Sequence, residues 1–215
     1  MRTPADWSFE GVEVAEHFDE HVREQLPFYD IVSGAVCHIA RHYLPQGGVM
    51  YDIGASTGNI TRLLAPTIVA RQVTAVSVES SVAMARLFRG EGQLAVADCL
   101  TYDYRDFDVA VLFLVMMFLP VEERDELLTY LMQKRRKGGA IIVVDKIEPP
   151  SGYLGTIMRR LTMAGKIANG ATAEQVIAKE LSLEGLQRPV NSHSFGQIGT
   201  QFFQYGEFAG WVIDG

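Results

Sequence analysis

Val49-Met50-Tyr51-Asp52-Ile53-Gly54-Ala55-Ser56-Thr57-Gly58 is the stretch that decides the fold of this 215-residue sequence. Its first five residues are mostly apolar and predict a buried strand, which runs directly into a turn that carries two glycines. The residues from Asn59 to Ala65 then predict a helix, ended by Pro66. A strand, a glycine turn and a helix in this order are typical of an α/β fold.

The same alternation continues along the chain. Apolar, β-branched segments predict strands over Gln72–Val78, Leu94–Ala97, Phe107–Leu114 and Ala140–Asp145. Between them, helical patterns cover Val82–Arg89 and Val121–Arg136, the second stopped by Gly138-Gly139. Because these strands are apolar on both faces, we expect a doubly wound, mostly parallel sheet covered by helices on both sides.

Different patterns flank this core. Apolar residues at helical spacing predict two helices ahead of it, Val14–Leu26 and Phe28–Tyr43, so N-terminal helices cover about 14–44. After Pro149-Pro150, two more helices over Tyr153–Asn169 and Thr172–Leu183 predict a helical lid at about 151–186. Thr200–Tyr205 and Phe208–Ile213 predict an antiparallel hairpin at the C-terminal end. We expect one domain over 1–215.

Composition is that of an ordinary globular protein. With 48% apolar residues the chain can bury a full core, and its net charge of -7 gives no general attraction to nucleic acid or anionic membranes. The basic run at 134–137 is expected at a helix end, where cations are favourable. No stretch of 18 uncharged apolar residues predicts a membrane span. Two cysteines without metal spacing, and an acidic N-terminus unlike a signal peptide, favour the cytoplasm.

Polar residues stand where three successive predicted strands end. Asp52 and Gly54 follow the first strand, Glu79 the second and Asp98 the third. Ligands of parallel sheets bind at this edge, and an acidic residue placed like Glu79 accepts hydrogen bonds from ribose hydroxyls. Gly54 and Gly58 would let the backbone approach a ligand closely. Each residue alone also fits a cap, a surface charge or a turn, but together they favour a nucleoside pocket.

The turn argues against two common nucleotide sites. Dinucleotide-binding turns carry G-x-G-x-x-G, whereas this one runs from Gly54 to Gly58 with Ala55 and Ser56 between. No Gly-Lys-Ser/Thr follows it, which excludes a P-loop. The expected ligand therefore has no pyrophosphate.

Taken together, these features resemble the class I S-adenosylmethionine (SAM)-dependent methyltransferases, with their Rossmann-like seven-stranded sheet. More closely, the chain is similar to the carboxy-SAM synthases of the tRNA wobble-uridine oxyacetate pathway. The matching segments are Phe18-Asp19-Glu20-His21-Val22, Leu26-Pro27-Phe28-Tyr29, Tyr51-Asp52-Ile53-Gly54-Ala55-Ser56, Phe118-Leu119-Pro120-Val121-Glu122-Glu123-Arg124, Lys137-Gly138-Gly139-Ala140 and Ala168-Asn169-Gly170. The resemblance extends from about Phe18 to Ile213.

The resemblance implies roles for individual residues. Tyr29 would close over the cofactor, while the Gly54 turn would contact its methionine part. Glu79 with Ser80 would bind the ribose and adenosine, and Asp98 with Cys99 the adenine. The expected site for SAM or carboxy-SAM is therefore Tyr29, Asp52, Gly54, Ala55, Ser56, Gly58, Glu79, Ser80, Asp98, Cys99 and Phe113. We expect no metal and identify no catalytic base.

Two positions depart from the carboxy-SAM synthase pattern. Phe113 stands where that family has an asparagine, and the shortened segment Val190–Gly199 lacks the arginine that grips the extra carboxylate. Arg159, Arg160 or Lys166 of the lid could supply a cation instead, although a helix face in solvent is the more ordinary explanation. Candidate substrate residues are Tyr153, Arg159, Arg188 and His193.

Three hypotheses follow. The first is a SAM-dependent methyltransferase whose acceptor is a small molecule or RNA. The second is a carboxy-SAM synthase variant that uses SAM and prephenate in tRNA modification. The third is a SAM-binding module without activity. The Asp/Asn-Pro-Pro-aromatic motif of amino-methylating enzymes is missing after the fourth strand, which disfavours that activity on nucleic acid. The resemblance also implies a homodimer.

Overall fold

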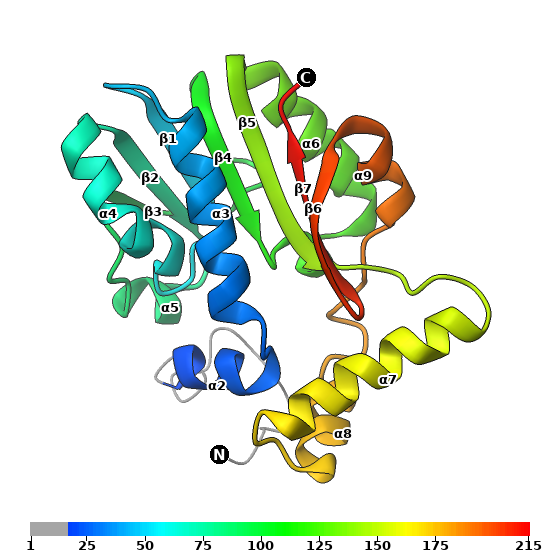
Figure 1. Ribbon diagram of the computed structural model, residues 1–215. Helices are drawn as coiled ribbons and strands as arrows, with labels where there is room; N and C mark the ends of the chain where they lie inside the picture. Colours follow the sequence, from blue (N-terminus) through cyan, green and yellow to red (C-terminus); the bar gives the residue numbers. More distant parts are fainter. Residues whose placement is uncertain (1–16) are drawn as a thin grey trace.

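A seven-stranded mixed sheet forms the centre of the molecule (Figure 1), seen in a computed structural model that describes residues 17–215. Its strand order is β3-β2-β1-β4-β5-β7-β6. The strands are β1 (Val49–Ile53), β2 (Thr74–Glu79), β3 (Gln93–Val96), β4 (Phe107–Phe113), β5 (Arg135–Lys146), β6 (Thr200–Tyr205) and β7 (Phe208–Ile213). β1 to β5 are parallel, whereas β7 pairs antiparallel with both β5 and β6. The predicted fold class is confirmed.

Helices cover both faces of the sheet. They are α2 (Phe18–Gln25), α3 (Tyr29–Tyr43), α4 (Asn59–Arg71), α5 (Val82–Arg86), α6 (Val121–Lys134), α7 (Tyr153–Ala168), α8 (Ala173–Ser182) and α9 (Ser192–Ile198), with a short 3-10 helix at Met116–Phe118. One apolar cluster joins α3 and α4 to the sheet, and a second joins α6 and α9 to its other face.

Side-chain alternation along β4 explains why both faces need cover. Val109 and Val111 belong to the cluster under α3 and α4, whereas Ala110 and Leu112 belong to the cluster under α6. All four side chains are fully buried. A strand that is apolar at every position therefore lies in the middle of a two-faced sheet, as its sequence predicts.

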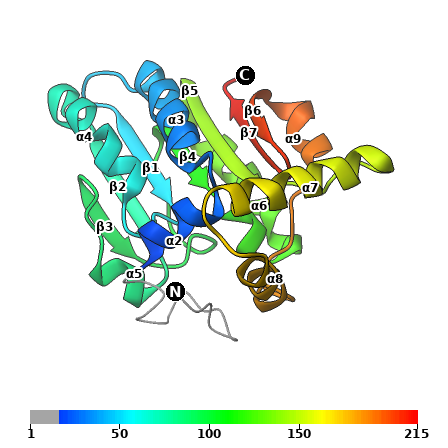
Figure 2. The same ribbon diagram turned by 60° about the horizontal axis from the view of Figure 1, so that its bottom comes forward.

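The lid and the N-terminal helix lie together at the carboxyl edge of the parallel strands. Figure 2 shows α2, α7 and α8 around this edge. Asn169, at the end of α7, donates hydrogen bonds from Nδ2 to the carbonyl oxygens of Arg23 and Glu24 in α2. The Asn169-Gly170 segment thus fastens the lid to α2 and closes one side of the space above the strands.

The helix after the glycine turn is longer than predicted. α4 continues through Pro66 to Arg71, with Gln72 as a left-handed C-cap. Proline removes one backbone donor and disfavours a helix interior, but Leu64 and Ile68 on either side of it are buried against the sheet. Burial of this face outweighs the loss of one hydrogen bond, so the prediction that Pro66 ends the helix was wrong.

The basic run was also misplaced by the sequence prediction. Only Lys134 ends α6, and Arg135 already begins β5, whose register against β4 shifts between Phe107 and Val109. Arg136 donates to Asp108 Oδ2 at 2.9 Å. Partners on β4 therefore hold this segment in the sheet.

Smaller differences concern helix ends and the N-terminus. The predicted helix Val82–Arg89 stops at Arg86. The predicted first helix began at Val14, which lies outside the described residues, as does the acidic N-terminal stretch. None of the helices within residues 17–215 is long and apolar enough to cross a membrane.

Candidate functional site

A cavity of about 590 Å³ opens at the carboxyl edge of the sheet, under α2 and the lid. Its size suits a small-molecule ligand. Ten of the eleven residues predicted for the cofactor line it, namely Tyr29, Asp52, Gly54, Ala55, Ser56, Glu79, Ser80, Asp98, Cys99 and Phe113. Gly58, the eleventh, does not belong to the lining and instead caps α4. The topology thus brings together residues from four strand ends and α3.

Neighbouring protein atoms leave no room for a side chain at either glycine of the turn. Gly54 has a φ of 69°, and a Cβ there would come within 2.5 Å of the Val115 side chain. Gly58 has a φ of 85°, and a Cβ there would come within 2.5 Å of the Gly90 nitrogen. The left-handed conformation favours glycine at both positions. Packing thus favours glycine at both positions, and Gly54 also lines the cavity. That the glycines let the backbone approach a ligand stays a prediction.

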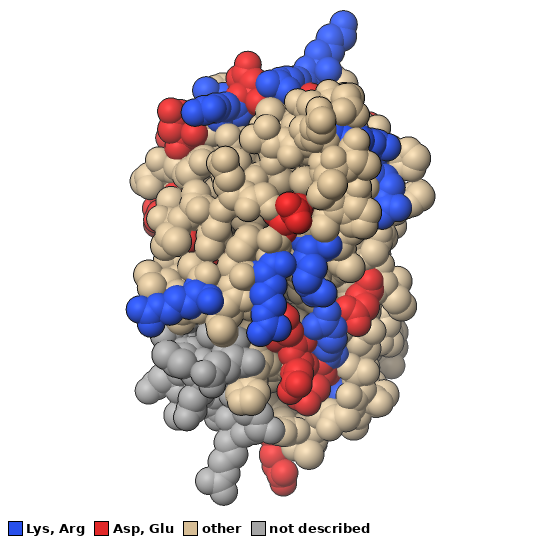
Figure 3. All heavy atoms as spheres, turned by 90° about the vertical axis from the view of Figure 1, so that its left-hand side faces the viewer, with Lys and Arg blue, Asp and Glu red and all other residues tan. Residues whose placement is uncertain are grey.

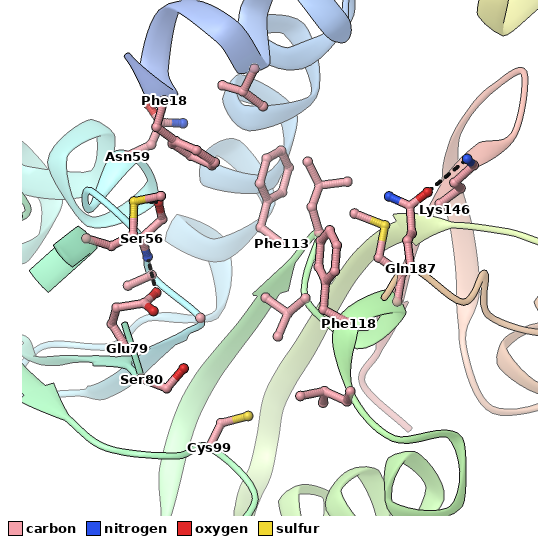
Figure 4. A pocket seen from close by; sticks show the side chains of 18 of the residues that line it. Phe18, Ser56, Asn59, Glu79, Ser80, Cys99, Phe113, Phe118, Lys146 and Gln187 are labelled. Atoms are coloured by element: carbon pink, nitrogen blue, oxygen red, sulfur yellow. Dashed lines mark hydrogen bonds between the residues drawn. The ribbon is translucent and has the colours of Figure 1, made fainter. Parts of the chain in front are cut away.

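Glu79 holds the turn against the end of β2. Its Oε2 accepts a hydrogen bond from the Ser56 backbone nitrogen at 2.7 Å, drawn in Figure 4, and its Oε1 accepts from the Ser81 nitrogen at 2.7 Å. The carboxylate is buried but still lines the cavity. The side chain therefore shapes the turn and also forms part of the cavity wall.

Asp52 is a buried acid at the floor of the cavity. Its side chain is 2% exposed, and burial raises its pKa to about 7 against the opposing effect of a hydrogen bond from the Thr61 backbone. Nearby Glu79 raises the pKa further. Within residues 17–215, Asp52 Oδ2 accepts no hydrogen bond. A buried acceptor without a donor is rare, and this one lies where a cationic or hydroxyl-bearing ligand would supply the donor.

Asp98 and Cys99 form the far wall beyond β3. Asp98 is exposed, and its Oδ1 accepts from the Leu100 nitrogen at 2.9 Å, which closes a turn. The Cys99 carbonyl accepts from Tyr104 Oη at 3.0 Å, and burial raises the pKa of the Cys99 thiol to about 12. The thiol therefore stays protonated at neutral pH, consistent with a packing role for its side chain.

Two aromatic residues meet above the turn. The rings of Tyr29 and Phe113 contact edge to face, with centroids 5.5 Å apart. The Arg23 guanidinium lies over the Tyr29 ring at 5.3 Å, and burial raises the pKa of Tyr29 well above its usual value. Phe113 therefore supplies an apolar surface at the cavity, where a polar amide would have offered hydrogen bonds.

The segment Phe18–Val22 contacts the glycine turn directly. Asp19 Oδ1 accepts from Thr57 Oγ1 at 2.6 Å, and Phe18, His21 and Val22 line the cavity. The turn is thereby joined to α2, which is joined in turn to the lid. The first matching segment of the sequence is thus part of the cavity wall.

The four candidate substrate residues lie outside the cavity lining. Tyr153 is 71% exposed at the start of α7, and Arg159 pairs with Glu207 at 3.5 Å. Arg188 contributes its backbone, since its carbonyl accepts from Arg124 at 2.9 Å. His193 lies in α9, where its ring contacts Gln197. These residues are not brought together.

Three buried lysines that the sequence did not single out as a group line the opposite end of the cavity. They are Lys146 at the end of β5, Lys166 in α7 and Lys179 in α8. Lys166 is only 5% exposed, so the explanation of a solvent-facing helix surface was wrong for this residue. The position of Lys146 at a strand end was a usable signal. On α8, Val176, Lys179 and Leu183 have the spacing of one buried face.

Comparison with known proteins agrees with this geometry. A methyltransferase domain family matches residues 51–143. A curated carboxy-S-adenosyl-L-methionine synthase from Staphylococcus epidermidis is 28% identical, with 97% of each chain covered.

Two solved structures share the fold. Magnesium protoporphyrin IX methyltransferase from Synechocystis PCC 6803, with bound SAH, has a TM-score of 0.56 at 14% identity and covers 88% of this chain and 85% of its own. The plantazolicin methyltransferase BpumL, also with SAH, has a TM-score of 0.61 at 13% identity. It matches 85% of this chain, which spans 66% of the BpumL chain. The chain therefore has the class I methyltransferase fold, and its residues 51–143 match a methyltransferase domain.

Proposed function

We propose that this protein is a methyltransferase that binds SAM in the cavity and methylates a small-molecule acceptor. The observation that carries the proposal is the convergence of the Gly54 turn, Glu79 and the Asp98-Cys99 loop on one cavity. SAM supplies an electrophilic methyl group on its sulfonium when bound. The role of the protein is to orient the reactants and exclude water.

The residues that line the cavity differ in charge between its two ends. Asp52 and Glu79 place negative charge near the turn, which suits the amino group and ribose hydroxyls of SAM. Cys99 offers a backbone nitrogen to adenine, while Phe113 and Phe118 supply apolar surface between this end and the lysines (Figure 4). The acceptor would then enter from the lid side, above the ends of β4 and β5.

One side of the molecule lacks the surface that RNA binding needs, which favours a small-molecule acceptor. On the side of the molecule where α4 and β3 lie, basic and acidic side chains stand next to one another (Figure 3). The chain as a whole carries a net charge of -7. An RNA-binding face is normally a continuous basic surface, and this side does not provide one.

Calorimetry with SAM tests the cofactor part of the proposal. We expect SAM to bind to the wild-type protein and Gly54→Arg to abolish binding, because the new side chain would enter the space of Val115 and the cavity. Gly34→Arg is the matched control, since Gly34 lies in α3 and a Cβ added there would meet no atom within 4 Å. Absence of SAM binding to the wild-type protein would overturn the proposal.

Carboxy-SAM synthesis from SAM and prephenate is the second candidate. Likeness to the Staphylococcus epidermidis synthase over 97% of both chains favours it. Against it, α9 has the sequence Ser-His-Ser-Phe-Gly-Gln-Ile and offers no arginine for a carboxylate. Mass spectrometry after incubation with SAM and prephenate tests this candidate: carboxy-SAM as the product supports synthesis, and unchanged SAM refutes it.

A further inference from the structure

The turn that follows β4, residues 114–119, has an unusual backbone conformation at its first residue. Leu114 has a φ of 63°, in the left-handed region that a residue with a Cβ adopts only at a cost. Its backbone nitrogen donates to the Val144 carbonyl oxygen of β5 at 2.7 Å, and its side chain lines the cavity. Backbone strain persists only where surrounding contacts hold it, and it gathers at ligand-binding sites. The contacts that hold this β4 turn therefore matter for the cavity.

Asp145, near the end of β5, holds the first half of the β4 turn. Its Oδ2 accepts hydrogen bonds from the backbone nitrogens of Met116 at 2.7 Å and Met117 at 3.4 Å, and its Oδ1 accepts from the Lys146 nitrogen at 2.8 Å. The side chain is fully buried. Burial raises its pKa to about 7, and the three backbone donors act against that effect. A buried acid is thus placed where it binds the backbone of the turn.

Arg124 of α6 holds the second half. Its Nε and Nη2 donate to the Leu119 carbonyl oxygen at 3.1 and 2.9 Å, and Nη2 also donates to the Arg188 carbonyl oxygen at 2.9 Å. The Arg188 nitrogen donates in turn to the Met117 carbonyl oxygen at 2.7 Å. Arg124 is 6% exposed. Two buried side chains of opposite charge therefore fix the backbone of one short turn.

Stability alone does not explain why Asp145 and Arg124 are charged. Apolar residues of similar volume often replace buried charged groups without loss of stability, or with a gain. Hydrogen bonds from a buried charged group, in contrast, can select one backbone conformation among several. Both residues bind backbone groups of the same turn, so the shape of the turn is the property that they determine.

The β4 turn is the wall between the two ends of the cavity. Phe118 of this turn stands between Glu79 and Lys146 in Figure 4. Val115 lies against the glycine turn, since a Cβ added to Gly54 would come within 2.5 Å of the Val115 side chain. The position of the β4 turn therefore affects the glycine turn, which is expected to contact the methionine part of SAM. The side chains of the β4 turn that line the cavity are Leu114, Val115, Met117, Phe118 and Leu119.

We propose that Asp145 and Arg124 are positioning residues, which hold the β4 turn as a preformed wall of the cavity and thereby set the affinity for SAM. The inference rests on the proposed SAM-dependent transfer in this cavity. Neither residue lines the cavity, so both act through the turn and not on the cofactor. A wall that already has its binding shape lowers the entropy that is lost when a ligand binds.

Calorimetry with SAM on the full chain tests this role at a temperature well below the unfolding transition. We expect Asp145→Ala to weaken SAM binding by roughly tenfold or more, because Met116 and Met117 lose their acceptor and the wall can move away from the glycine turn. Arg124→Met keeps an apolar stem and loses the guanidinium, and it should also weaken SAM binding. Asp145→Asn should recover part of the affinity, since its amide oxygen can still accept from Met116.

Ile142→Ala is the matched control for lost stability. Ile142 lies in β5, as Asp145 does, and is fully buried, but it does not line the cavity. The control should lower the melting temperature because it leaves a cavity in the core, while SAM affinity stays within about threefold of the wild type.

Hydrogen exchange followed by mass spectrometry adds a readout that needs no cofactor. Without SAM, the amides of peptides covering residues 114–119 should exchange roughly tenfold or more faster in Asp145→Ala than in the wild type, because the turn has lost its acceptor. Peptides from β1 and β2 should exchange at the same rate in both proteins. Ile142→Ala should leave exchange of residues 114–119 unchanged relative to the rest of the sheet.

Each outcome decides the proposal. Weaker SAM binding together with faster exchange of the β4 turn in Asp145→Ala, with neither in Ile142→Ala, supports it. Normal SAM affinity in Asp145→Ala and Arg124→Met overturns it, even if both variants melt at lower temperature, because the two residues would then serve stability alone. If Asp145→Ala does not fold, Arg124→Met and Asp145→Asn decide by the same two measurements. If the wild type binds no SAM, the proposed function fails, and exchange of residues 114–119 still shows whether Asp145 holds the turn.

Discussion

Gly54 shows how a single residue sets the shape of the turn. Its φ of 69°, and the 2.5 Å that would separate an added Cβ from Val115, leave no room for a side chain. We expect Gly54→Ala to lower the free energy of unfolding by about 1–3 kcal/mol. Urea denaturation followed by circular dichroism measures the change. Gly34→Ala in α3 is the matched control, and it should stabilise by about 0.5–1 kcal/mol because nothing crowds it.

Asp52 predicts a pH dependence of stability. Burial raises its pKa in the folded state from the ordinary value of 3.8 to about 7. The folded state therefore holds a proton that the unfolded state has released, so this group makes the wild type less stable as pH rises from about 4 to about 7. Asp52→Asn should gain stability relative to wild type across that window, by at most about 1.4 kcal/mol per pH unit.

Urea midpoints at pH 5, 6, 7 and 8 check this prediction. Asp145 is also fully buried, with its pKa raised to about 7 by burial, so the wild-type curve alone does not isolate Asp52. The difference between Asp52→Asn and wild type does, because Asp145 is present in both. A difference that stays constant over the four pH values would contradict the raised pKa of Asp52.

At the scale of elements, α4 contains a proline, Pro66, because packing of the helix against the sheet stabilises it by more than the proline costs. Pro66 is exposed on the outer side of the helix and leaves the Arg62 carbonyl without its usual backbone donor. We expect Pro66→Ala to raise the free energy of unfolding by about 1–2 kcal/mol. Pro45→Ala is the control: Pro45 lies in the loop before β1, where no helical hydrogen bond can be regained. Equal effects of the two substitutions, measured in urea, would contradict this explanation.

The elements also show what a sequence can predict. The central strands β4 and β5 were predictable because Val109–Leu112 and Ala140–Val144 are apolar on both faces, and the acidic residues at the strand ends could be placed on one edge of the sheet. The start of β5 could not be placed, because Arg135 and Arg136 owe their position to partners on other segments, Gly215 and Asp108. The crowding of Gly54 by Val115 was also hidden, since it depends on a loop 61 residues further along the chain.

The three buried lysines of the cavity, Lys146, Lys166 and Lys179, could not be predicted as a group for a similar reason. Lys166 follows Gly165 on a helix whose other face is exposed, so only the packing of α7 against α8 and the sheet reveals its burial. The end of the cavity near Glu79 was predictable because strand order alone assembles it. The lid end depends on how two helices fold back over the strands, and that arrangement has no local signal in the sequence.

At the scale of the whole molecule, the lid presents an apolar surface that fits the homodimer implied by the family resemblance. Leu154, Ile157 and Leu161 follow one face of α7 and are 50%, 42% and 41% exposed, next to Tyr153 at 71%. Exposed apolar patches of this kind mark interaction sites. We therefore predict that two copies associate through this face of α7, which would leave the cavity lining intact because none of these residues belongs to it.

Light scattering coupled to size-exclusion chromatography tests the dimer. The wild-type protein should elute with twice the chain mass of 23.8 kDa, and the double variant Ile157→Glu, Leu161→Glu should elute as a monomer, because a charge at a buried interface core is strongly unfavourable. Val69→Glu is the control, since Val69 is 65% exposed on α4, away from the lid. A wild-type monomer at micromolar concentration refutes the dimer, and a variant that remains dimeric places the interface elsewhere. SAM affinity should be unchanged in the double variant, because neither Ile157 nor Leu161 lines the cavity.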